Sequence, residues 1–263
     1  MNTRTKAELF LLALTVIWGS TFVLSKYLLE SISPLIYIAI RFAFATILFG
    51  ILFPRKAFAG PKSSWKKGGI LGVLLFLGFA TQTIGLQYTG ASKSAFITGM
   101  MVIFTPICQL IIERRAPKVG NVIGVLLVTL GLYFLTSPEG SEFNLGDVLN
   151  LCCAVTFALY IVYLDVFSKG HDPVHLTMAQ FVVCTVLGSA FALSFESVRV
   201  APTVAGGLTL LYLIVFATVI ALFVQNRYQK DTTPTRSVVT LSAPECVSVP
   251  SLEVVTHRCP PYG

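Results

Sequence analysis

Eight long apolar segments constrain this chain more than any other feature of its sequence. They cover residues 7–29, 34–53, 67–87, 92–112, 119–137, 147–167, 174–194 and 205–228. An α-helix needs about 20 apolar residues to cross the hydrocarbon core of a bilayer. Only 12% of the residues are charged, about half the share that a soluble domain carries. We therefore expect an all-α, polytopic membrane helix bundle with about eight transmembrane helices.

The lysine and arginine residues alternate between the two sides of these predicted spans. Fourteen of them precede or follow the spans on one side: Arg4, Lys6, Arg55, Lys56, Lys62, Lys66, Lys67, Arg114, Arg115, Lys118, Lys169, Arg227, Lys230 and Arg236. The opposite side has three, Lys26, Lys93 and Arg199. Because basic loops stay in the cytoplasm, we expect a plasma (inner) membrane protein with a cytoplasmic N-terminus. The net charge of +7 then reflects orientation in the membrane rather than binding to nucleic acid.

A weak internal repeat adds to this picture. The segment Pro34-Leu-Ile-Tyr-Ile-Ala-Ile-Arg41-Phe42 has an echo 139 positions later, Pro173-Val-His-Leu-Thr-Met-Ala-Gln180-Phe181. Pro34 opens the second span and Pro173 the seventh, so the repeating unit contains five spans. An odd number of spans makes the second unit enter the membrane from the other side, which predicts an inverted repeat.

Several short motifs then resemble a known family. They are Trp18-Gly19-Ser20-Thr21-Phe22, Arg41-Phe42, Gly85-Leu-Gln-Tyr88-Thr-Gly-Ala91-Ser, and a fourth span that runs through Thr105-Pro106 to Glu113. In this order and spacing, over about residues 7–236, they resemble the EamA-like family of the drug/metabolite transporter superfamily. The resemblance implies ten spans in two five-span repeats and the transport of small metabolites or drugs. We expect a secondary transporter that works by alternating access.

The resemblance also predicts where the chain departs from the family. Residues 7–137 form the first repeat, 147–239 an incomplete second repeat, and 240–263 an atypical tail. That tail contains Pro244, Pro250, Glu245 and Glu253, and proline and glutamate both disfavour a spanning helix. We expect a C-terminally truncated or frameshifted relative of a ten-span protein, with a genuine divergent tail as the alternative. A truncated, non-transporting or accessory membrane protein is the alternative function.

Polar side chains inside spans are costly in lipid and are therefore candidates for a substrate cavity. Arg41 is the strongest, because its own span contains no acidic residue; the alternative is an arginine that reaches the outer interface. The candidate set, which includes aromatic and flexible neighbours, is Trp18, Ser20, Arg41, Gln82, Thr98, Met101, Tyr160 and Gln180. For Gln82 and Tyr160, structural hydrogen bonding and packing remain alternatives. We expect Gln225 and Asn226, near the end of the eighth span, to be interfacial.

Small residues and one proline are candidates for helix packing. Gly78, Gly85, Gly120 and Gly124 would let helices approach closely, and Pro106 could kink its helix and expose a carbonyl.

The sequence contains no pattern that indicates an enzyme. His171 and His175 straddle Pro173 without a third metal ligand nearby, and none of the six cysteines has metal-ligand or C-x-x-C spacing. No phosphate-binding loop or nucleotide fingerprint is present. We expect no metal and no cofactor; the partners are a small-molecule substrate and the lipid bilayer, and the sequence leaves open whether two copies form a homodimer.

Overall fold

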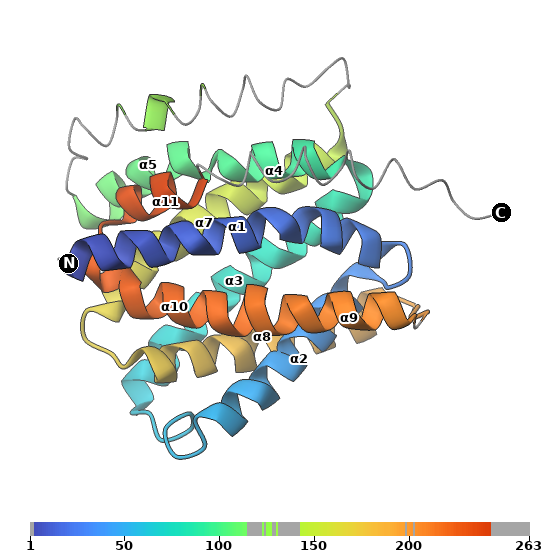
Figure 1. Ribbon diagram of the computed structural model, residues 1–263, viewed down its shortest axis with the longest axis horizontal. Helices are drawn as coiled ribbons and strands as arrows, with labels where there is room; N and C mark the ends of the chain where they lie inside the picture. Colours follow the sequence, from blue (N-terminus) through green and yellow to red (C-terminus); the bar gives the residue numbers. More distant parts are fainter. Residues whose placement is uncertain are drawn as a thin grey trace.

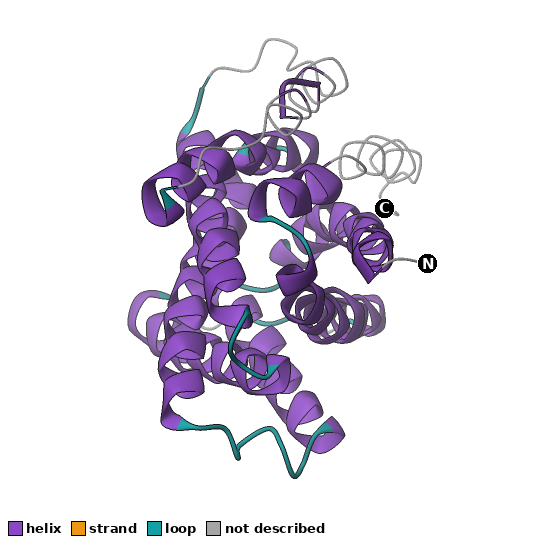
Figure 2. Cartoon of the chain, turned by 90° about the vertical axis from the view of Figure 1, so that its left-hand side faces the viewer, coloured by secondary structure: helices purple, strands orange, loops and turns teal. Residues whose placement is uncertain are grey.

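The computed structural model describes residues 3–114, 123, 125–127, 130, 143–197, 199–201 and 203–242. Its α-helices are α1 (Thr3–Leu29), α2 (Pro34–Leu52), α3 (Lys62–Tyr88), α4 (Ala91–Gly99), α5 (Met101–Glu113), α7 (Leu145–Ser168), α8 (Pro173–Phe195), α9 (Val204–Tyr212), α10 (Ala221–Tyr228) and α11 (Pro234–Ser242). A π-helix, η1 (Leu213–Ile220), joins α9 to α10, and a 3-10 turn, η2 (Gln229–Asp231), precedes α11. Within these residues β-structure is limited to one isolated bridge, between Ile32 and Val200 (Figure 2).

Seven helical stretches in the described residues are long and apolar enough to cross a membrane. They are Phe10–Leu29, Pro34–Leu52, Lys62–Tyr88, Ala91–Glu113, Leu145–Ser168, Pro173–Phe195 and Val204–Tyr228. This confirms the predicted all-α polytopic bundle, and the chain is a multi-pass membrane protein. The predicted fifth span, 119–137, falls largely outside the described residues, as do Gly120, Gly124 and the tail after Ser242.

Two of the spans are interrupted near their middle. The fourth span breaks at Met100, whose backbone N–H donates to the carbonyls of Ile97 and Thr98. The helix continues through Pro106, so this break lies six residues before the proline at which a kink was expected. The span that contains α9 and α10 passes through the π-helical segment η1. Such segments are rare and often mark functional positions.

The long helices pack as antiparallel pairs. Helix α2 begins beside the end of α8, where the Ser33 N–H donates to the Arg199 carbonyl over 3.1 Å. The carboxylate of Glu196 accepts from the backbone N–H groups of Leu35 and Ile36, which caps α2 with an acid from the end of α8. An acid is favourable there because the first N–H groups of a helix have no intrahelical partner.

Helix α3 forms the second antiparallel pair, with α7. At Gly78, an added Cβ would lie 2.4 Å from the ring of Phe157, and at Gly85 it would lie 2.9 Å from the carbonyl oxygen of Gly146. The two glycines thus allow the backbones of α3 and α7 to approach closely. In Figure 1, α1 crosses the middle of the view, with α4 and α5 on one side of it and α9 and α10 on the other.

The contacts also sort the loops between two ends of the bundle. At one end Gly60 contacts His175, and Lys67 lies 5.5 Å from the ring centroid of Phe167. At the other end Lys26 donates to the carbonyl of Thr89 over 2.8 Å. Loops for which the basic residues predict the same side of the membrane therefore meet at the same end of the bundle.

Candidate functional site

A central cavity lies between the helices, with about 580 Å³ of empty space including the solvent at its mouth. Helices α1, α2, α3, α4, α5, α7 and α10 all contribute to its wall. The lining residues are Trp18, Thr21, Phe22, Arg41, Leu75, Phe79, Gln82, Thr98, Met101, Phe157, Tyr160, Ile161, Leu222 and Gln225. The wall is thus mostly apolar and aromatic, with a few polar groups at separate positions, as is typical of small-molecule sites.

Arg41 is the charged residue among the described residues of this wall. Its side chain is 2% exposed, and it points into the bundle rather than to the interface. Its Nε donates to the Thr218 hydroxyl over 2.6 Å, and Nη1 donates to the Tyr37 hydroxyl over 2.9 Å. The guanidinium carbon lies 4.9 Å from the ring centroid of Phe79, within the range of a cation–π contact. These contacts fix the guanidinium in one orientation at the cavity wall.

Thr98, Gln225 and Gln82 are neutral polar residues of the lining. The Thr98 hydroxyl and the Gln225 side-chain oxygen are buried and have no hydrogen-bond partner within the described part of the chain. Gln82 lies on α3, one turn from Phe79. A buried polar atom without a partner costs about 1–3 kcal/mol. A bound molecule that hydrogen-bonds these atoms would therefore recover that free energy.

Trp18, Ser20 and Met101 were also predicted to face a cavity; Trp18 and Met101 line it, and Ser20 does not. Trp18 lines the cavity, and its indole N–H donates to the carbonyl of Ala217 in η1 over 3.1 Å. Met101 lines it at the start of α5. Ser20 lies outside the lining, and its hydroxyl is 3.1 Å from the Tyr212 hydroxyl. Ser20 thus connects α1 to α9.

Tyr160 and Gln180 belong to a buried network beside the cavity. The Tyr160 hydroxyl donates to the Gln180 side-chain oxygen over 3.0 Å, and the Asn226 amide donates to Thr177 over 2.7 Å. Tyr160 also lines the cavity, whereas Gln180 lies behind it. Gln225 and Asn226, which were expected near the membrane interface, do not reach the surface of the bundle: their side chains are 2% and 0% exposed. Their hydrogen-bonding groups face neighbouring helices and the cavity instead.

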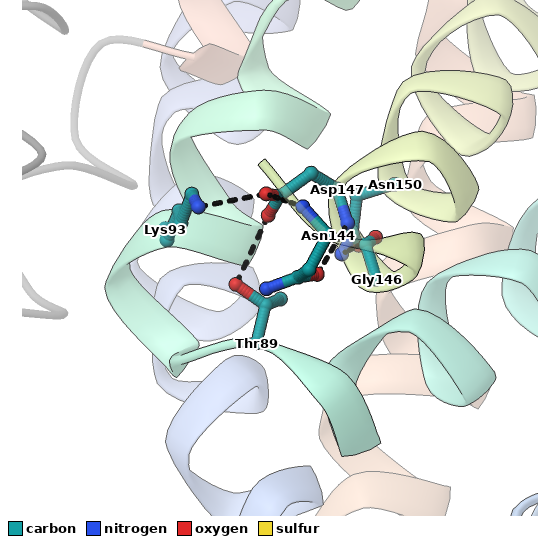
Figure 3. Close-up of polar contacts among 6 residues, drawn as sticks. All are labelled: Thr89, Lys93, Asn144, Gly146, Asp147 and Asn150. Carbon is teal, nitrogen blue, oxygen red and sulfur yellow. Dashed lines mark hydrogen bonds and ion pairs between the residues drawn. The ribbon is translucent and has the colours of Figure 1, made fainter. Parts of the chain in front are cut away.

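A polar cluster joins three helices at one end of the bundle (Figure 3). Lys93 Nζ lies 2.7 Å from the Asp147 carboxylate, which also accepts from the Thr89 hydroxyl over 3.2 Å. Asp147 and Asn144 form a capping box, in which each side chain accepts the backbone N–H of the other. The Asn150 amide donates to the carbonyl of Gly146 over 2.8 Å. These bonds tie the end of α3 and the start of α4 to the start of α7.

This cluster lies close to the cavity along two helices. Ser94 donates to the Asn150 side-chain oxygen over 2.8 Å, and Thr98 of the lining is one turn further along α4. Asp147 was not among the residues predicted for a site. Two signals were present: an acid in an otherwise apolar span, and the spacing Asn144-x-x-Asp147 of a capping box.

Among the residues that the structure describes, no three His, Cys, Asp or Glu side chains come together as a group that could hold a metal ion. His171 lies at the end of α7, where its ring nitrogen is 2.9 Å from the Phe167 carbonyl. The described residues of the cavity wall provide one cation, several aromatic rings and a few neutral polar groups.

Comparisons with known proteins agree with this architecture. Residues 5–137 and 144–255 match the EamA-like transporter family. An uncharacterized transporter of Archaeoglobus fulgidus is 34% identical over 91% of this chain and 74% of its own length. An S-adenosylmethionine/S-adenosylhomocysteine transporter of Chlamydia muridarum is 35% identical over 49% of this chain and 42% of its own length.

A solved crystal structure shares the fold at 19% identity, with a TM-score of 0.75 over 98% of this chain and 91% of the other. The family resemblance seen in the motifs is thereby confirmed: the chain is a polytopic member of the EamA-like transporter family.

Proposed function

We propose that this protein is a secondary transporter that moves a small organic solute across the plasma (inner) membrane by alternating access. One observation carries the proposal. The central cavity is lined both by α1–α5, from the first predicted repeat, and by α7 and α10, from the second. In transporters with inverted repeats, the solute binds between the two repeats near the middle of the membrane.

The orientation follows from charge. The end of the bundle that holds Gly60, His175 and Lys67 carries most of the basic residues, which supports placing it, and the N-terminus, in the cytoplasm. The cluster around Lys93 and Asp147 then lies at the outer end. We assign it as the outer gate, because it ties α3 and α4 to α7 above the cavity. Solute release to the outside requires these bonds to break.

Uptake into proteoliposomes tests the proposal. The purified chain is reconstituted and offered a defined mixture of amino acids and nucleosides, together with S-adenosylmethionine, which the Chlamydia relative's name makes a natural first probe. Solute inside the vesicles is measured by mass spectrometry. We expect saturable uptake of at least one solute that depends on the protein.

A cavity-filling variant and a matched control make the test specific. Thr98→Trp places an indole in the cavity and should abolish uptake, since Thr98 is a buried lining residue. Ile47→Trp adds the same side chain at a position that is 59% exposed on the lipid side of α2, and uptake should persist. If no solute moves in a protein-dependent way, or if both variants transport equally well, the proposal is wrong.

A further inference from the structure

We infer that the transported solute is a small organic monoanion whose carboxylate binds Arg41 and whose apolar body lies against the aromatic wall of the cavity. The inference rests on the proposed transport function and adds the chemical class of the substrate.

Arg41 is a cation that lies inside the bundle without an acidic partner among the described residues. Its side chain is 98% buried, and its hydrogen bonds within the described residues go to two neutral hydroxyl groups, those of Thr218 and Tyr37. The ion pairs of the described residues, Lys93–Asp147 and Lys169–Asp165, do not involve it. A buried charge is costly unless it is paired. Arg41 is therefore a cation whose counter-ion the described part of the protein does not supply.

The Arg41 guanidinium keeps N–H groups available for a ligand. An arginine has five N–H groups, of which one on Nε and one on Nη1 donate to protein hydroxyls. The other three, including both on Nη2, have no acceptor among the described residues. Two N–H groups on adjacent nitrogens match the two oxygens of a carboxylate. The contact with Phe79 holds the fork in place before a solute arrives.

The charge of the cavity lining limits the charge of the solute. The described residues of the lining include Arg41 as their single cation and contain no aspartate or glutamate. One cation in an apolar wall can neutralise one negative charge. A dianion would bring an unpaired charge into the cavity, and a cation would meet repulsion from Arg41.

The rest of the wall describes the body of the solute. Phe79, Phe157 and Trp18 present aromatic surface, which favours an apolar or flat group. The unpartnered oxygens of Thr98 and Gln225 offer hydrogen bonds to one further polar substituent. The cavity thus suits an amphipathic acid better than a highly polar one.

A series of probes of similar size, differing in charge, tests the inference by binding alone. Phenylacetate, its neutral amide phenylacetamide, the cation phenethylamine and the dianion phenyl phosphate are titrated into the purified protein, and binding is followed by isothermal calorimetry. We expect phenylacetate to bind roughly tenfold or more tightly than each of the other three.

Variants then assign the preference to Arg41. Arg41→Gln should bring the affinity for phenylacetate down to that for phenylacetamide, and Arg41→Lys should keep part of the difference. Arg199→Gln is the control. It removes an exposed arginine that follows the end of α8 and lies outside the cavity lining, and it should leave the affinity for phenylacetate unchanged. If Arg41→Gln does not fold, the wild-type series and Arg41→Lys decide the question.

Several results would overturn the inference. They are equal binding of phenylacetate and its amide, tighter binding of phenyl phosphate, or an unchanged preference in a folded Arg41→Gln protein. Failure of this inference is distinct from failure of the transport proposal. Uptake of a neutral solute that Thr98→Trp blocks and Arg41→Gln spares would retain transport and reject the anion. Binding of the carboxylate to Arg41 without any uptake would support the anion site and reject the transport proposal.

Discussion

The hydroxyl groups of Thr46 and Thr185 lie 3.0 Å apart, and the two residues are separated by 139 positions. That is the spacing between Pro34 and Pro173, which begin α2 and α8. Residues that are equivalent in two repeats touch each other where a twofold axis passes between the repeats. The contact between Thr46 and Thr185 is the one that a twofold axis between α2 and α8 would produce, so it agrees with the predicted inverted repeat.

A second pair supports the same axis. Phe42 and Phe181 are also 139 positions apart, and their ring centroids are separated by 6.0 Å. Each of the two helices also has a glycine that faces the other helix. A Cβ added at Gly50 of α2 would meet Met178 of α8, and a Cβ added at Gly188 of α8 would meet Ala39 of α2. The five-span repeat itself remains a prediction, because the fifth span lies largely outside the described residues.

The Thr46–Thr185 contact predicts a small but measurable coupling between α2 and α8. Each hydroxyl also lies 2.8 Å from a carbonyl of its own helix, so two hydrogens serve three contacts. We expect Thr46→Val and Thr185→Val each to lower the free energy of unfolding by about 0.5–1 kcal/mol, with an interaction energy of about 0.6 kcal/mol in the double variant. Unfolding by SDS in mixed micelles measures this.

A matched control for that cycle is Thr156→Val, because Thr156 donates to a carbonyl within its own helix, that of Cys152. Its effect should add to that of Thr46→Val without coupling. Strict additivity of Thr46→Val and Thr185→Val would contradict a hydrogen bond between the two helices.

The membrane spans and one cavity residue could be predicted from the sequence, because a bilayer requires long apolar helices and disfavours charged side chains within them. The spans follow from the length of apolar runs, and Arg41 stands out because a charge inside such a run is expensive. Phe79 and Phe157 could not be recognised as cavity residues, since an aromatic residue in an apolar span looks the same whether it faces lipid, a helix or a cavity. The π-helix at Leu213–Ile220, which packs against α1 and α2, has no recognisable signal in its sequence.

Two glycines of α3 predict stability changes of opposite sign. A Cβ at Gly78 would lie 2.4 Å from the Phe157 ring, whereas a Cβ at Gly69 would meet nothing within 4 Å. Gly78→Ala should therefore lower the free energy of unfolding by about 1–3 kcal/mol, because overpacking forces α3 and α7 apart or moves the ring. Gly69→Ala should raise it by roughly 0.5 kcal/mol through better helix propensity. Thermal unfolding in detergent compares the two, and destabilisation by both would rule out the packing argument.

Asp147 both pairs with Lys93 and caps α7, so substituting it should destabilise the protein more than substituting an aspartate that only caps a helix. Asp147→Ala loses the ion pair with Lys93, the bond from Thr89 and the cap of α7, and should cost about 3 kcal/mol. Asp147→Asn keeps an oxygen for the cap and should cost less. Asp172→Ala is the matched control, because Asp172 caps α8 through Val174 and is exposed; it should cost about 1 kcal/mol. Equal losses for Asp147→Ala and Asp172→Ala would mean that the Lys93–Asp147 pair contributes nothing.

Thr218 predicts a link between Arg41 and the π-helical segment. Its hydroxyl accepts from Arg41 Nε over 2.6 Å and donates to the carbonyl of Leu213 over 2.8 Å. Thr218→Val removes both bonds and leaves the buried guanidinium with one hydroxyl partner, that of Tyr37, among the described residues. Since a hydrogen bond to a charged group contributes about 1.5–3 kcal/mol, we expect a loss of that size in SDS unfolding. Thr218→Ser retains the hydroxyl and should lose less than half as much.

Phenylacetate titration on both variants completes the test: if Thr218 holds the Arg41 guanidinium in place, Thr218→Val should bind the acid more weakly than Thr218→Ser does. Equal stability and equal affinity of the two variants would show that the hydroxyl does not position Arg41.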